Sequence, residues 1–595
     1  MSRNPAESRG LGELVLRHAR ATPDKPAFVL VTDVKADASD IMTYGELATR
    51  ALRRLRGLTA EPGLSQGDRV VLALPTGPEF VELYVACLMG GLVAVPVPVP
   101  GSSRDAGHRF AGIVRDCRAG LVLTTEQDLR EVRAALAKTG QEHQCRAIMP
   151  LPEDDTDPTA RPVVEDGDVA VLQYTSGSIS DPKGVMISHA NITRNARAFA
   201  DALGLGPADR LGGWAPLHHD MGLFLLLSTS LTLGGTCVLM SPLSFLKRPK
   251  DWLRMVDRHR ITVTAAPSFA FELCLRTFSD ADLDSVDLNR LRYVLNGAEP
   301  IVESVMNAFM ERFRRAGFNP RAMTPGYGLA ESTVFVTCKA PESLPQEFRA
   351  DPDAFQRGEL RSAEKNGTPL VGCGFPGDLE LRIADPETGE EVAAQRIGEI
   401  WLRGPSVGLG YWNRPDDTEH TFRAATAVAA DGSDWLRTGD LGSVVDDELY
   451  VTGRLKELLI VRGRNIYPQD IEAEARASHP ALTGLIGSAF SVPDATEERP
   501  VVVHEVHPRT AAEEFPAVAA AVRERLFSRL GLALGDIVLV RRGSVRRTTS
   551  GKIQRLAMRD RFLRGELARQ YAESDTGTPA PGSSAERAMA DLGNA

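Results

Sequence analysis

Apolar and polar positions alternate along the first 150 residues in the order expected of strands separated by helices. Residues 69–74 and 93–97 are short runs of apolar and β-branched side chains, which are typical of buried strands. Residues 79–89, between these runs, have the length and the apolar content of a buried helix. A strand, a helix and a second strand in this order predict a parallel sheet covered by helices on both faces.

The pattern changes in the second half of the chain. Residues 379–383, 398–402 and 448–451 have the composition of short strands with turn residues between them, which predicts a smaller β-rich unit. From about residue 455 a compact alternation of helix-like and strand-like segments follows, and this change marks an expected domain boundary.

These patterns predict an α/β fold with two domains. The large N-terminal domain, residues 1–454, would hold the parallel sheets and a small β-rich subdomain, and the small α+β C-terminal domain would span 455–572. Residues 341–371 are polar and proline-bearing, so we expect an inserted surface segment there. Residues 573–595 are rich in Gly, Pro, Ser and Ala, a composition that predicts a disordered tail.

One stretch, residues 221–240, has the length of a membrane span and contains no charged residue. Gly234 and Gly235 divide it, and several Ser and Thr side chains lie within it. We therefore expect a buried helix followed by a central strand at 236–240, and no membrane span.

Composition narrows the class of protein. The chain has 595 residues, of which 43% are hydrophobic and 25% charged, as in an ordinary protein with several packed domains. Its formal net charge of -10 gives no general support for binding nucleic acid. The seven cysteines show no CxxC spacing, and the N-terminus has no apolar core of the signal-peptide kind. Both features predict a cytoplasmic protein without a structural zinc site.

A loop of small residues follows the strand-like run 169–173. Glycines admit close approach of backbone N–H groups to anionic oxygens, hydroxyls add donors, and a lysine adds positive charge, so the loop is suited to hold phosphates. Gly184 follows the lysine, which excludes a P-loop motif. A flexible turn between two strands is the alternative. The candidate phosphate-binding residues are Thr175, Ser176, Gly177, Ser178 and Lys183.

Two further loops are candidate ligand contacts. Gly297, Ala298 and Glu299 follow an apolar strand, and ligands of open α/β sheets bind at the carboxyl ends of strands. The segment that contains Gly326, Tyr327, Gly328 and Glu331 lacks the third glycine of a dinucleotide fingerprint. Tyr327 could stack on a flat base. Glu331 could bind Mg²⁺ through a carboxylate oxygen, or could be an acid in a first helical turn.

Three other polar positions are candidates with competing structural interpretations. His218 and His219 adjoin Asp220, but neighbouring rings rarely face one metal ion, so we expect His219 to line a polar pocket or to fix a turn. Asp440 could accept hydrogen bonds from a ribose diol or form a turn. Lys552 is the one lysine of the polar loop 547–555.

Taken together, these stretches resemble the adenylate-forming superfamily of acyl-CoA synthetases, luciferases and peptide-synthetase adenylation domains. The matching motifs, in the family's order over residues 170–555, are TSGSISDPKG, GYGLAE, TGDLG, GRLKELLIVRGRNI and TTSGKIQR. Five further stretches are similar to the fatty acyl-AMP ligase branch: HHDMGL, MSPLSFLKRPKDWL, PSFAFELC, NGAEPI and RGRNIYPQDIE. Residues 341–371 lie where that branch carries an insertion.

Two departures from the family pattern are small. Residues 178–180 read Ser-Ile-Ser where a Ser, Thr and Gly run is commoner, and Glu457 stands where Asp is usual. Neither removes a required chemical group.

The resemblance implies an enzyme that activates a fatty acid with ATP and Mg²⁺, releases pyrophosphate and forms an acyl-adenylate. A phosphopantetheine thiol of an acyl carrier protein, supplied in trans, would then accept the acyl group. The mobile small domain would rotate about Lys456 between the two steps. The helix after Met221 and residues 267–274 would wall the acyl tunnel.

The same resemblance implies individual roles. Residues 175–183 would hold the β- and γ-phosphates, and Glu331 would hold Mg²⁺. Tyr327 and residues 297–299 would hold adenine, while Asp440 and Arg454 would hold ribose. His219 would flank the reacting carboxylate, and Lys552 would bridge it to the developing negative charge.

Two rival functions follow from the same residues. The first is an acyl-CoA ligase that uses free CoA as the acceptor. The second is a non-catalytic binding protein on the same scaffold, which the joint presence of Lys552, Glu331 and Asp440 argues against.

Overall fold

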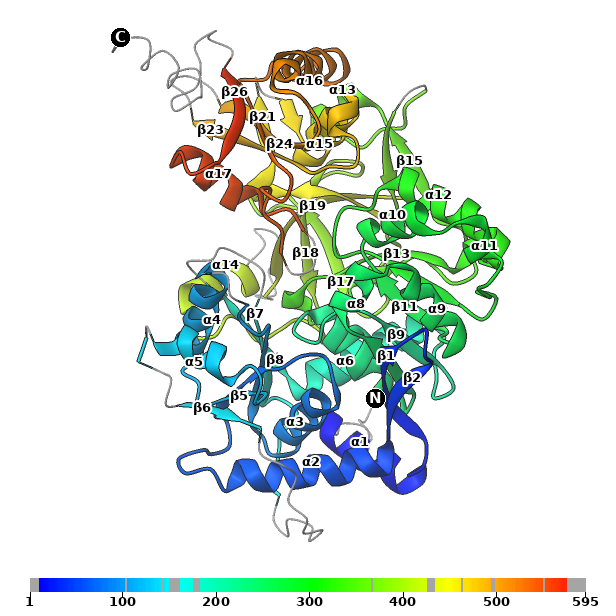
Figure 1. The fold of residues 1–595 in the computed structure, drawn as a ribbon, viewed down its shortest axis with the longest axis vertical. Helices are drawn as coiled ribbons and strands as arrows, with labels where there is room; N and C mark the ends of the chain where they lie inside the picture. The colour runs from blue at the N-terminus through cyan, green and yellow to red at the C-terminus, as the bar shows by residue number, and fades with distance from the viewer. Residues whose placement is uncertain are drawn as a thin grey trace.

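The computed structural model describes residues 10–101, 104–137, 139–140, 144–148, 161–174, 182–364, 367–424, 434–461, 464–493, 498–548 and 552–574. The larger sheets form the lower part of the molecule in Figure 1, and the C-terminal strands and helices lie above them.

The largest sheet has eight strands in the order β14-β13-β12-β11-β9-β10-β1-β2. Neighbours from β13 to β1 run parallel, and both edges end in an antiparallel pair. The strands are β1 (Pro26–Asp33), β2 (Ala38–Thr43), β9 (Arg210–Gly213), β10 (Thr236–Met240), β11 (Val263–Ala266), β12 (Tyr293–Asn296), β13 (Met323–Tyr327) and β14 (Thr337–Cys338).

The second sheet has six strands in the order β6-β5-β3-β4-β7-β8, all parallel to their neighbours except the pair β7/β8. The strands are β3 (Arg69–Ala73), β4 (Val93–Val97), β5 (Leu121–Thr124), β6 (Cys145–Ala147), β7 (Val169–Tyr174) and β8 (Gly184–Ser188). Helices α3 (Pro78–Met89) and α6 (His189–Leu203) share a buried core with both sheets. Helices α4 (Arg104–Asp116) and α5 (Leu129–Ala137) cover the other face. The predicted α/β fold with helices on both faces is confirmed.

Residues 221–240 form the buried helix and central strand that the sequence predicts. Met221–Ser228 is a π-helical segment, η2, which continues as α7 (Thr229–Leu233) before β10. The Ser228 and Thr229 hydroxyls donate to carbonyls five residues earlier, which satisfies polar groups inside an apolar core. Among the described residues, no helix combines the length and the apolar character needed to cross a membrane.

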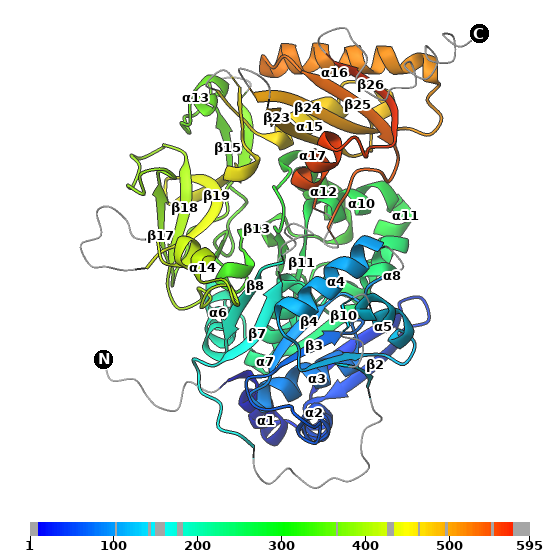
Figure 2. The same cartoon turned by 90° about the vertical axis from the view of Figure 1, so that its left-hand side faces the viewer.

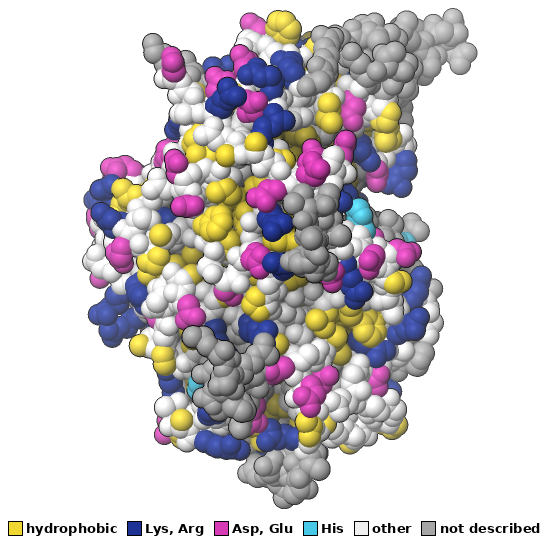
Figure 3. All heavy atoms as spheres, turned by 180° about the vertical axis from the view of Figure 1, so that it is seen from behind, with side chains coloured by type: hydrophobic (Ala, Val, Ile, Leu, Met, Phe, Trp, Pro, Cys, Tyr) yellow, Lys and Arg dark blue, Asp and Glu magenta, His cyan; other side chains and the backbone are white. Residues whose placement is uncertain are grey.

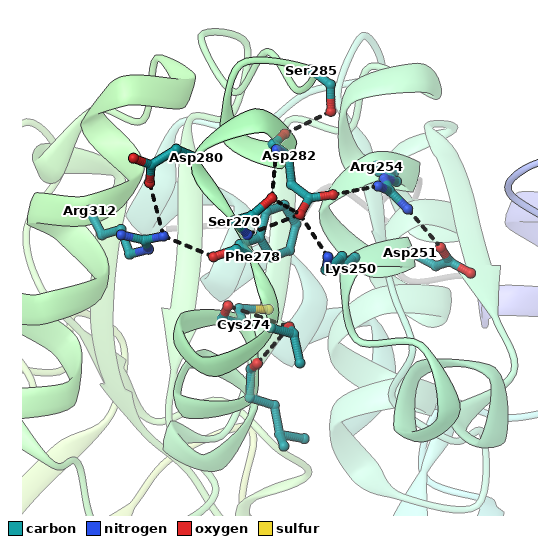
Figure 4. A network of polar contacts seen from close by, with 12 residues as sticks. Lys250, Asp251, Arg254, Cys274, Phe278, Ser279, Asp280, Asp282, Ser285 and Arg312 are labelled. Atoms are coloured by element: carbon teal, nitrogen blue, oxygen red, sulfur yellow. Dashed lines mark hydrogen bonds and ion pairs between the residues drawn. The ribbon is translucent and has the colours of Figure 1, made fainter.

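The outer face of the eight-stranded sheet is covered by α9 (Lys250–Arg258), α10 (Ser268–Thr277), α11 (Asp280–Leu283) and α12 (Glu303–Phe313). Figure 4 shows the polar network that joins them. Asp282 accepts from Lys250 Nζ at 2.7 Å and from Arg254 Nη2 at 2.9 Å, so α11 is tied to α9. Arg312 of α12 donates to the Phe278 carbonyl at 2.8 Å.

A β-rich unit follows in the chain. Strands β17 (Glu380–Ala384), β18 (Gly398–Arg403), β19 (Leu436–Val445) and β20 (Glu448–Arg454) form one antiparallel sheet. A short helical turn, η6 (Leu455–Glu457), leads out of β20 into the C-terminal part of the chain.

The C-terminal sheet has the order β23-β24-β25-β26, with apolar cores on both faces. Its elements are α15 (Pro468–Arg476), β23 (Gly487–Pro493), β24 (Glu498–Val506), α16 (Phe515–Leu530), β25 (Asp536–Arg541), α17 (Arg555–Leu563) and β26 (Arg569–Ser574). The expected start of the tail at residue 573 is wrong, because Ser574 pairs with Asp536 in this sheet. Residues 575–595 lie outside the described part.

The segment 341–371 forms a small lobe. Strands β15 (Glu347–Ala350) and β16 (Thr368–Val371) pair antiparallel, with α13 (Pro352–Gln356) between them in the chain. Both views place α13 beside the C-terminal sheet (Figures 1 and 2). On the face shown in Figure 3, basic and acidic side chains are interspersed, with apolar side chains between them.

Gly222 allows η2 to begin next to the loop before it, and we predict that Gly222→Ala destabilises the protein. A Cβ there would lie 2.3 Å from the Pro216 carbonyl oxygen and 2.6 Å from that of Ala215. Such overpacking costs about 1–3 kcal/mol, so the calorimetric unfolding midpoint should fall by several degrees.

The matched control is Gly57→Ala in α2 (Tyr44–Thr59), where an added Cβ has no neighbour within 4 Å. Replacing a helical glycine by alanine should stabilise by roughly 0.5–1 kcal/mol. An unchanged unfolding midpoint for Gly222→Ala would contradict the prediction, because it would show that the loop before η2 moves away from the added Cβ at no cost in stability.

Candidate active site

A cavity of about 540 Å³ lies at the carboxyl ends of strands from both large sheets, where open α/β sheets bind ligands. Its wall comes from the loop after β4, from α4, from residues 218–221, and from the loops after β12 and β13. The C-terminal residues Arg546, Arg547, Thr548, Lys552 and Gln554 close it from the other side.

Lys552 is held at the cavity by two hydrogen bonds to Thr548. The Thr548 N–H donates to the Lys552 carbonyl at 2.8 Å, and the Lys552 N–H donates to Thr548 Oγ1 at 3.1 Å. Burial and the positive charge of Arg454 lower the pKa of the Lys552 ammonium, whereas three carboxylates act in the opposite direction. These carboxylates belong to Asp220, Asp440 and Glu299.

Arg555 fixes this loop to the beginning of the small domain. Its Nη1 donates to Glu457 at 2.6 Å, and its Nε and Nη2 donate to Glu472 at 2.7 and 2.8 Å. All three side chains are largely buried, so these charge-assisted bonds constrain the geometry strongly. Glu457, one of the two departures from the family pattern, supplies the required carboxylate.

Tyr327, Asp440 and Arg454 form one cluster. The Tyr327 hydroxyl donates to Asp440 Oδ2 at 2.8 Å, and Arg454 Nε lies 3.0 Å from Asp440 Oδ1. Burial, together with the Asp440 carboxylate, raises the pKa of Tyr327 well above its ordinary value. Sequence reasoning gave Tyr327 only a stacking ring, and the hydroxyl is a second functional group that it missed. Asp440 itself is buried behind the cavity wall, yet each of its oxygens keeps a lone pair for another donor.

The two glycine-containing loops lie back to back. A Cβ on Gly297 would lie 2.8 Å from the Gly326 carbonyl oxygen, and one on Gly328 only 1.8 Å from that of Val334. Ala298, between them in space, has φ +65°, a left-handed conformation that only a constrained alanine adopts. These contacts bring Gly297, Ala298, Gly326, Tyr327 and Gly328 together on the cavity wall, as the sequence predicts.

Glu299 is not on that wall. Its Oε1 accepts the Phe269 N–H at 2.9 Å, at the start of α10. Burial raises the pKa of its carboxyl. The expectation that Glu299 contacts adenine is therefore not met in this structure, because its carboxylate caps a neighbouring helix instead.

Glu331 lines the cavity from the short helix η5 (Ala330–Ser332). The Tyr411 hydroxyl donates to Glu331 Oε1 at 2.8 Å. In the described part of the chain, no three His, Cys, Asp or Glu side chains converge on a possible metal. A single carboxylate still fits Mg²⁺, since this ion is usually held by one or two carboxylates together with substrate phosphates.

Lys183 does not line the cavity. Its ammonium lies 2.6 Å from Asp417 of α14 (Pro415–Phe422) and 5.2 Å from the centre of the Tyr411 ring. Phosphate binding would require this lysine to leave Asp417. The other predicted phosphate contacts, Thr175, Ser176, Gly177 and Ser178, lie outside the described residues.

His219 lines the cavity, as expected, and Asp220 adjoins it. His219 Nδ1 lies 2.6 Å from Asp220 Oδ1, and this carboxylate also accepts the Met221 N–H at 2.7 Å. Burial opposes ionisation of Asp220, but the charges of His219 and Lys552 hold its pKa below the ordinary value. Burial lowers the pKa of the neighbouring His218 to about 3. Adjacency of Asp220 to a histidine was the sequence signal for this pair.

The apolar part of the cavity wall extends away from these polar groups. It includes Met221 and Leu225 of η2, as predicted, but no residue from 267–274, which packs in the core of the outer helices instead. The apolar wall also includes Val97, Val99, Phe110, Ile113, Val334 and Phe335. Arg109 of α4, which sequence reasoning missed, lies on the same wall.

Two parallel sheets, a β-rich unit and a small domain that delivers one lysine into a nucleotide-sized cavity define an adenylate-forming enzyme. The chain belongs to the AMP-binding enzyme family, whose model matches residues 15–412, and to its fatty acyl-AMP ligase branch.

The relatives support this placement. Long-chain-fatty-acid–AMP ligase FadD26 of Mycobacterium marinum is 35% identical, over 94% of this chain and 98% of its own. Medium-chain-fatty-acid–[acyl-carrier-protein] ligase JamA of Moorena producens is 35% identical, over 88% and 90%. 4-Hydroxyphenylalkanoate adenylyltransferase of Mycobacterium tuberculosis is 35% identical, over 96% and 94%.

Solved structures agree in fold. A chain from work on fatty acyl-adenylate ligases of E. coli and L. pneumophila matches with a TM-score of 0.83 and 31% identity, over 94% of this chain and 99% of that one. A fatty acyl-adenylate ligase of L. pneumophila in complex with acyl adenylate and pyrophosphate matches with a TM-score of 0.72 and 30% identity, over 95% and 98%.

We predict that Tyr327→Phe weakens AMP binding about 3- to 10-fold in calorimetric titration. The sequence alone favours a nearly neutral effect, because phenylalanine keeps the stacking ring. The structure changes this expectation, because the substitution removes the hydrogen bond that helps to orient Asp440, and such a bond contributes about 0.5–1.5 kcal/mol.

The control is Tyr571→Phe, which removes a similar hydroxyl–carboxylate bond, to Glu573, far from the cavity. It should leave AMP affinity unchanged. Wild-type affinity in Tyr327→Phe would assign the whole contribution to the ring.

Proposed function

We propose that this protein activates a fatty acid with ATP to give an acyl-adenylate and pyrophosphate, and then transfers the acyl group to the phosphopantetheine thiol of an acyl carrier protein supplied in trans. The observation that carries the proposal is the entry of Lys552 into a cavity that also contains Tyr327, Glu331 and His219.

The first step joins two anions. A carboxylate oxygen attacks the α-phosphorus of ATP, a new C–O–P bond forms, and pyrophosphate leaves with the electron pair of the broken P–O bond. Lys552 suits this step because its ammonium lies where the carboxylate and the developing phosphate charge meet, and preorganised charge is effective in a largely dry site. His219 flanks the carboxylate.

The nucleotide would be held by the groups on the cavity wall. Tyr327 and the loop of Gly297 and Ala298 suit adenine, and Asp440 with Arg454 suits the ribose hydroxyls. Mg²⁺, held by Glu331 and phosphate oxygens, would neutralise part of the phosphate charge.

The acyl chain fits the apolar part of the wall around Leu225, Ile113 and Phe335. Each methylene removed from water there contributes ~0.8 kcal/mol. The affinity for the fatty acid should therefore rise with each added methylene until the acyl chain reaches the end of the cavity. FadD26 and JamA are named for long and medium chains respectively, and both classes remain candidates for the substrate here.

The choice of acceptor depends on rotation of the small domain about Lys456, which is exposed in η6. The lobe 341–371 contacts that domain: the Phe355 ring stacks on Tyr467 at 4.8 Å between centroids, and Gln356 Oε1 accepts from Arg464 at 3.1 Å. These contacts stabilise the orientation in which Lys552 is in the cavity. An acyl-CoA ligase with free CoA as acceptor is the alternative.

The reaction is placed in the cytoplasm, where ATP is available and thiols stay reduced. All seven cysteines are free and buried, as expected of a chain from a reducing compartment.

Lys552→Ala should lower the rate of acyl-AMP formation about 10²–10³-fold, the usual effect of removing one preorganised charge-stabilising donor. Fatty-acid-dependent pyrophosphate exchange measures this rate. The control is Lys247→Ala on α8 (Pro242–Lys247), an exposed lysine outside the cavity, which should keep the wild-type rate. A wild-type rate in Lys552→Ala would remove this residue from its role, and no exchange in the wild type would favour a non-catalytic scaffold.

Phe355→Ala should leave acyl-AMP formation within about twofold and raise acyl-CoA formation from free CoA several-fold. The substitution removes the ring contact between Phe355 and Tyr467, which is worth about 0.5–1.5 kcal/mol. This contact stabilises the orientation with Lys552 in the cavity, in which the thiol step does not take place, so its loss shifts the population toward the other orientation. Mass spectrometry of both products gives the partition.

The control is Leu344→Ala, an exposed apolar residue of the same lobe, which should leave the partition unchanged. An unaltered partition in Phe355→Ala would mean that the lobe is a tolerated insertion. Efficient acyl-CoA synthesis by the wild type would favour the acyl-CoA ligase instead.

A further inference from the structure

His219 and Asp220 form a hydrogen-bonded pair whose proton can be located. Two atoms that both carry lone pairs do not approach to 2.6 Å, so a proton lies between His219 Nδ1 and Asp220 Oδ1. The Met221 N–H lies 2.7 Å from the same carboxylate oxygen but 3.3 Å from His219 Nδ1, so it donates to Asp220. The imidazole therefore donates at Nδ1.

The other ring nitrogen is free to act on a ligand. His219 lines the cavity and its side chain is 18% exposed, while its Nδ1 is engaged with Asp220. In the neutral ring Nε2 carries a lone pair. A lone pair donates no hydrogen bond to the carboxylate that His219 flanks in the first half-reaction, but it accepts a proton from a thiol. This nitrogen consequently suits the second half-reaction better than the first.

The charged groups around the pair come from three elements. Lys552, on the small domain, faces Asp220, and His218 adjoins His219 on the same loop. Arg109 of α4 acts on His218. Of these, only Lys552 moves with the small domain, so rotation of that domain changes the field at Asp220.

We propose that Asp220 is a positioning residue that holds His219 as the general base for the acceptor thiol. The proposal rests on the function proposed above and deepens it by assigning the proton transfer of the thiol step. A histidine oriented by a carboxylate at Nδ1 and basic at Nε2 is a recurring arrangement for activating nucleophiles.

The thiol proton passes to His219 Nε2 while sulfur forms a C–S bond to the carbonyl carbon of the acyl-adenylate. The C–O bond to the phosphate then breaks, and its electron pair leaves with AMP. The imidazolium, paired with Asp220, returns the proton to solvent.

Rotation of the small domain strengthens this base at the right time. While Lys552 is in the cavity, its positive charge also acts on the Asp220 carboxylate. After Lys552 leaves, the carboxylate charge acts on His219 alone, so the imidazolium formed in the thiol step becomes more favourable.

The test compares two half-reactions in Asp220→Asn. Asparagine can still accept the Met221 N–H, so the start of η2 is preserved, but its amide donates to Nδ1 and places the ring proton at Nε2. Acyl-AMP formation is followed with dodecanoic acid and ATP, and thiol transfer with purified dodecanoyl-AMP and pantetheine. The thioester rate, divided by the acyl-AMP rate of the same variant, should fall about 10²–10³-fold at pH 7.

Three readouts distinguish positioning from a structural role. The loss of normalised thioester rate in Asp220→Asn should shrink roughly tenfold per pH unit toward pH 8.5, because the thiol then ionises without a base. Asp220→Asn should add little to the loss already caused by His219→Ala, since it acts through that ring. Asp220→Glu should recover part of the thioester rate.

Equal losses in both half-reactions, or additive losses in the double variant, would overturn the proposal. A wild type that makes no acyl-AMP from dodecanoic acid and ATP would overturn the proposed function instead. Transfer from purified dodecanoyl-AMP is measured independently of that result, so the two failures are distinguishable.

Discussion

The ammonium of Lys552 must reach a cavity built mainly by another domain, and much of the polar structure around the cavity depends on that constraint. A lysine side chain loses up to about 2 kcal/mol of rotamer entropy when it is fixed, so its loop has to be held firmly. Arg555 provides this support by binding Glu457 and Glu472 together. The lobe around Phe355 then holds the domain that carries the loop.

The cavity itself depends on close backbone packing. Gly297 leaves no room for a Cβ beside the Gly326 carbonyl, so the loops at the ends of β12 and β13 can approach each other, and Gly328 lets the second loop fold closely onto its own Val334. Tyr327 in turn reaches Asp440, 113 residues further along the chain. The Tyr327 hydroxyl thereby joins the β-rich unit to the cavity wall. A substitution at Tyr327 or at Asp440 therefore alters both the cavity wall and the β-rich unit.

Local patterns were sufficient to predict the fold and part of the cavity wall. The apolar runs gave the parallel strands and the buried helix before β10, and the glycine-rich loops gave Gly297, Gly326 and Gly328. The errors concern side chains whose partners are distant in sequence. Lys183 lies on Asp417 and Glu299 caps α10, and neither partner adjoins the motif that carries the residue. Periodicity and spacing carry no information about such pairs.

The electrostatics of Lys552 are compatible with the proposed reaction in two orientations of the small domain. Asp220, Asp440 and Glu299 attract it, but each already accepts hydrogen bonds, from His219, Tyr327 and Phe269 respectively. Within the part of the chain that the structure describes, no carboxylate comes within 4 Å of the Lys552 ammonium. The lysine is therefore drawn into the cavity without being locked in an ion pair. A locked pair would compete with the substrate carboxylate and would oppose the proposed rotation of the small domain, whereas diffuse attraction is compatible with both proposed steps.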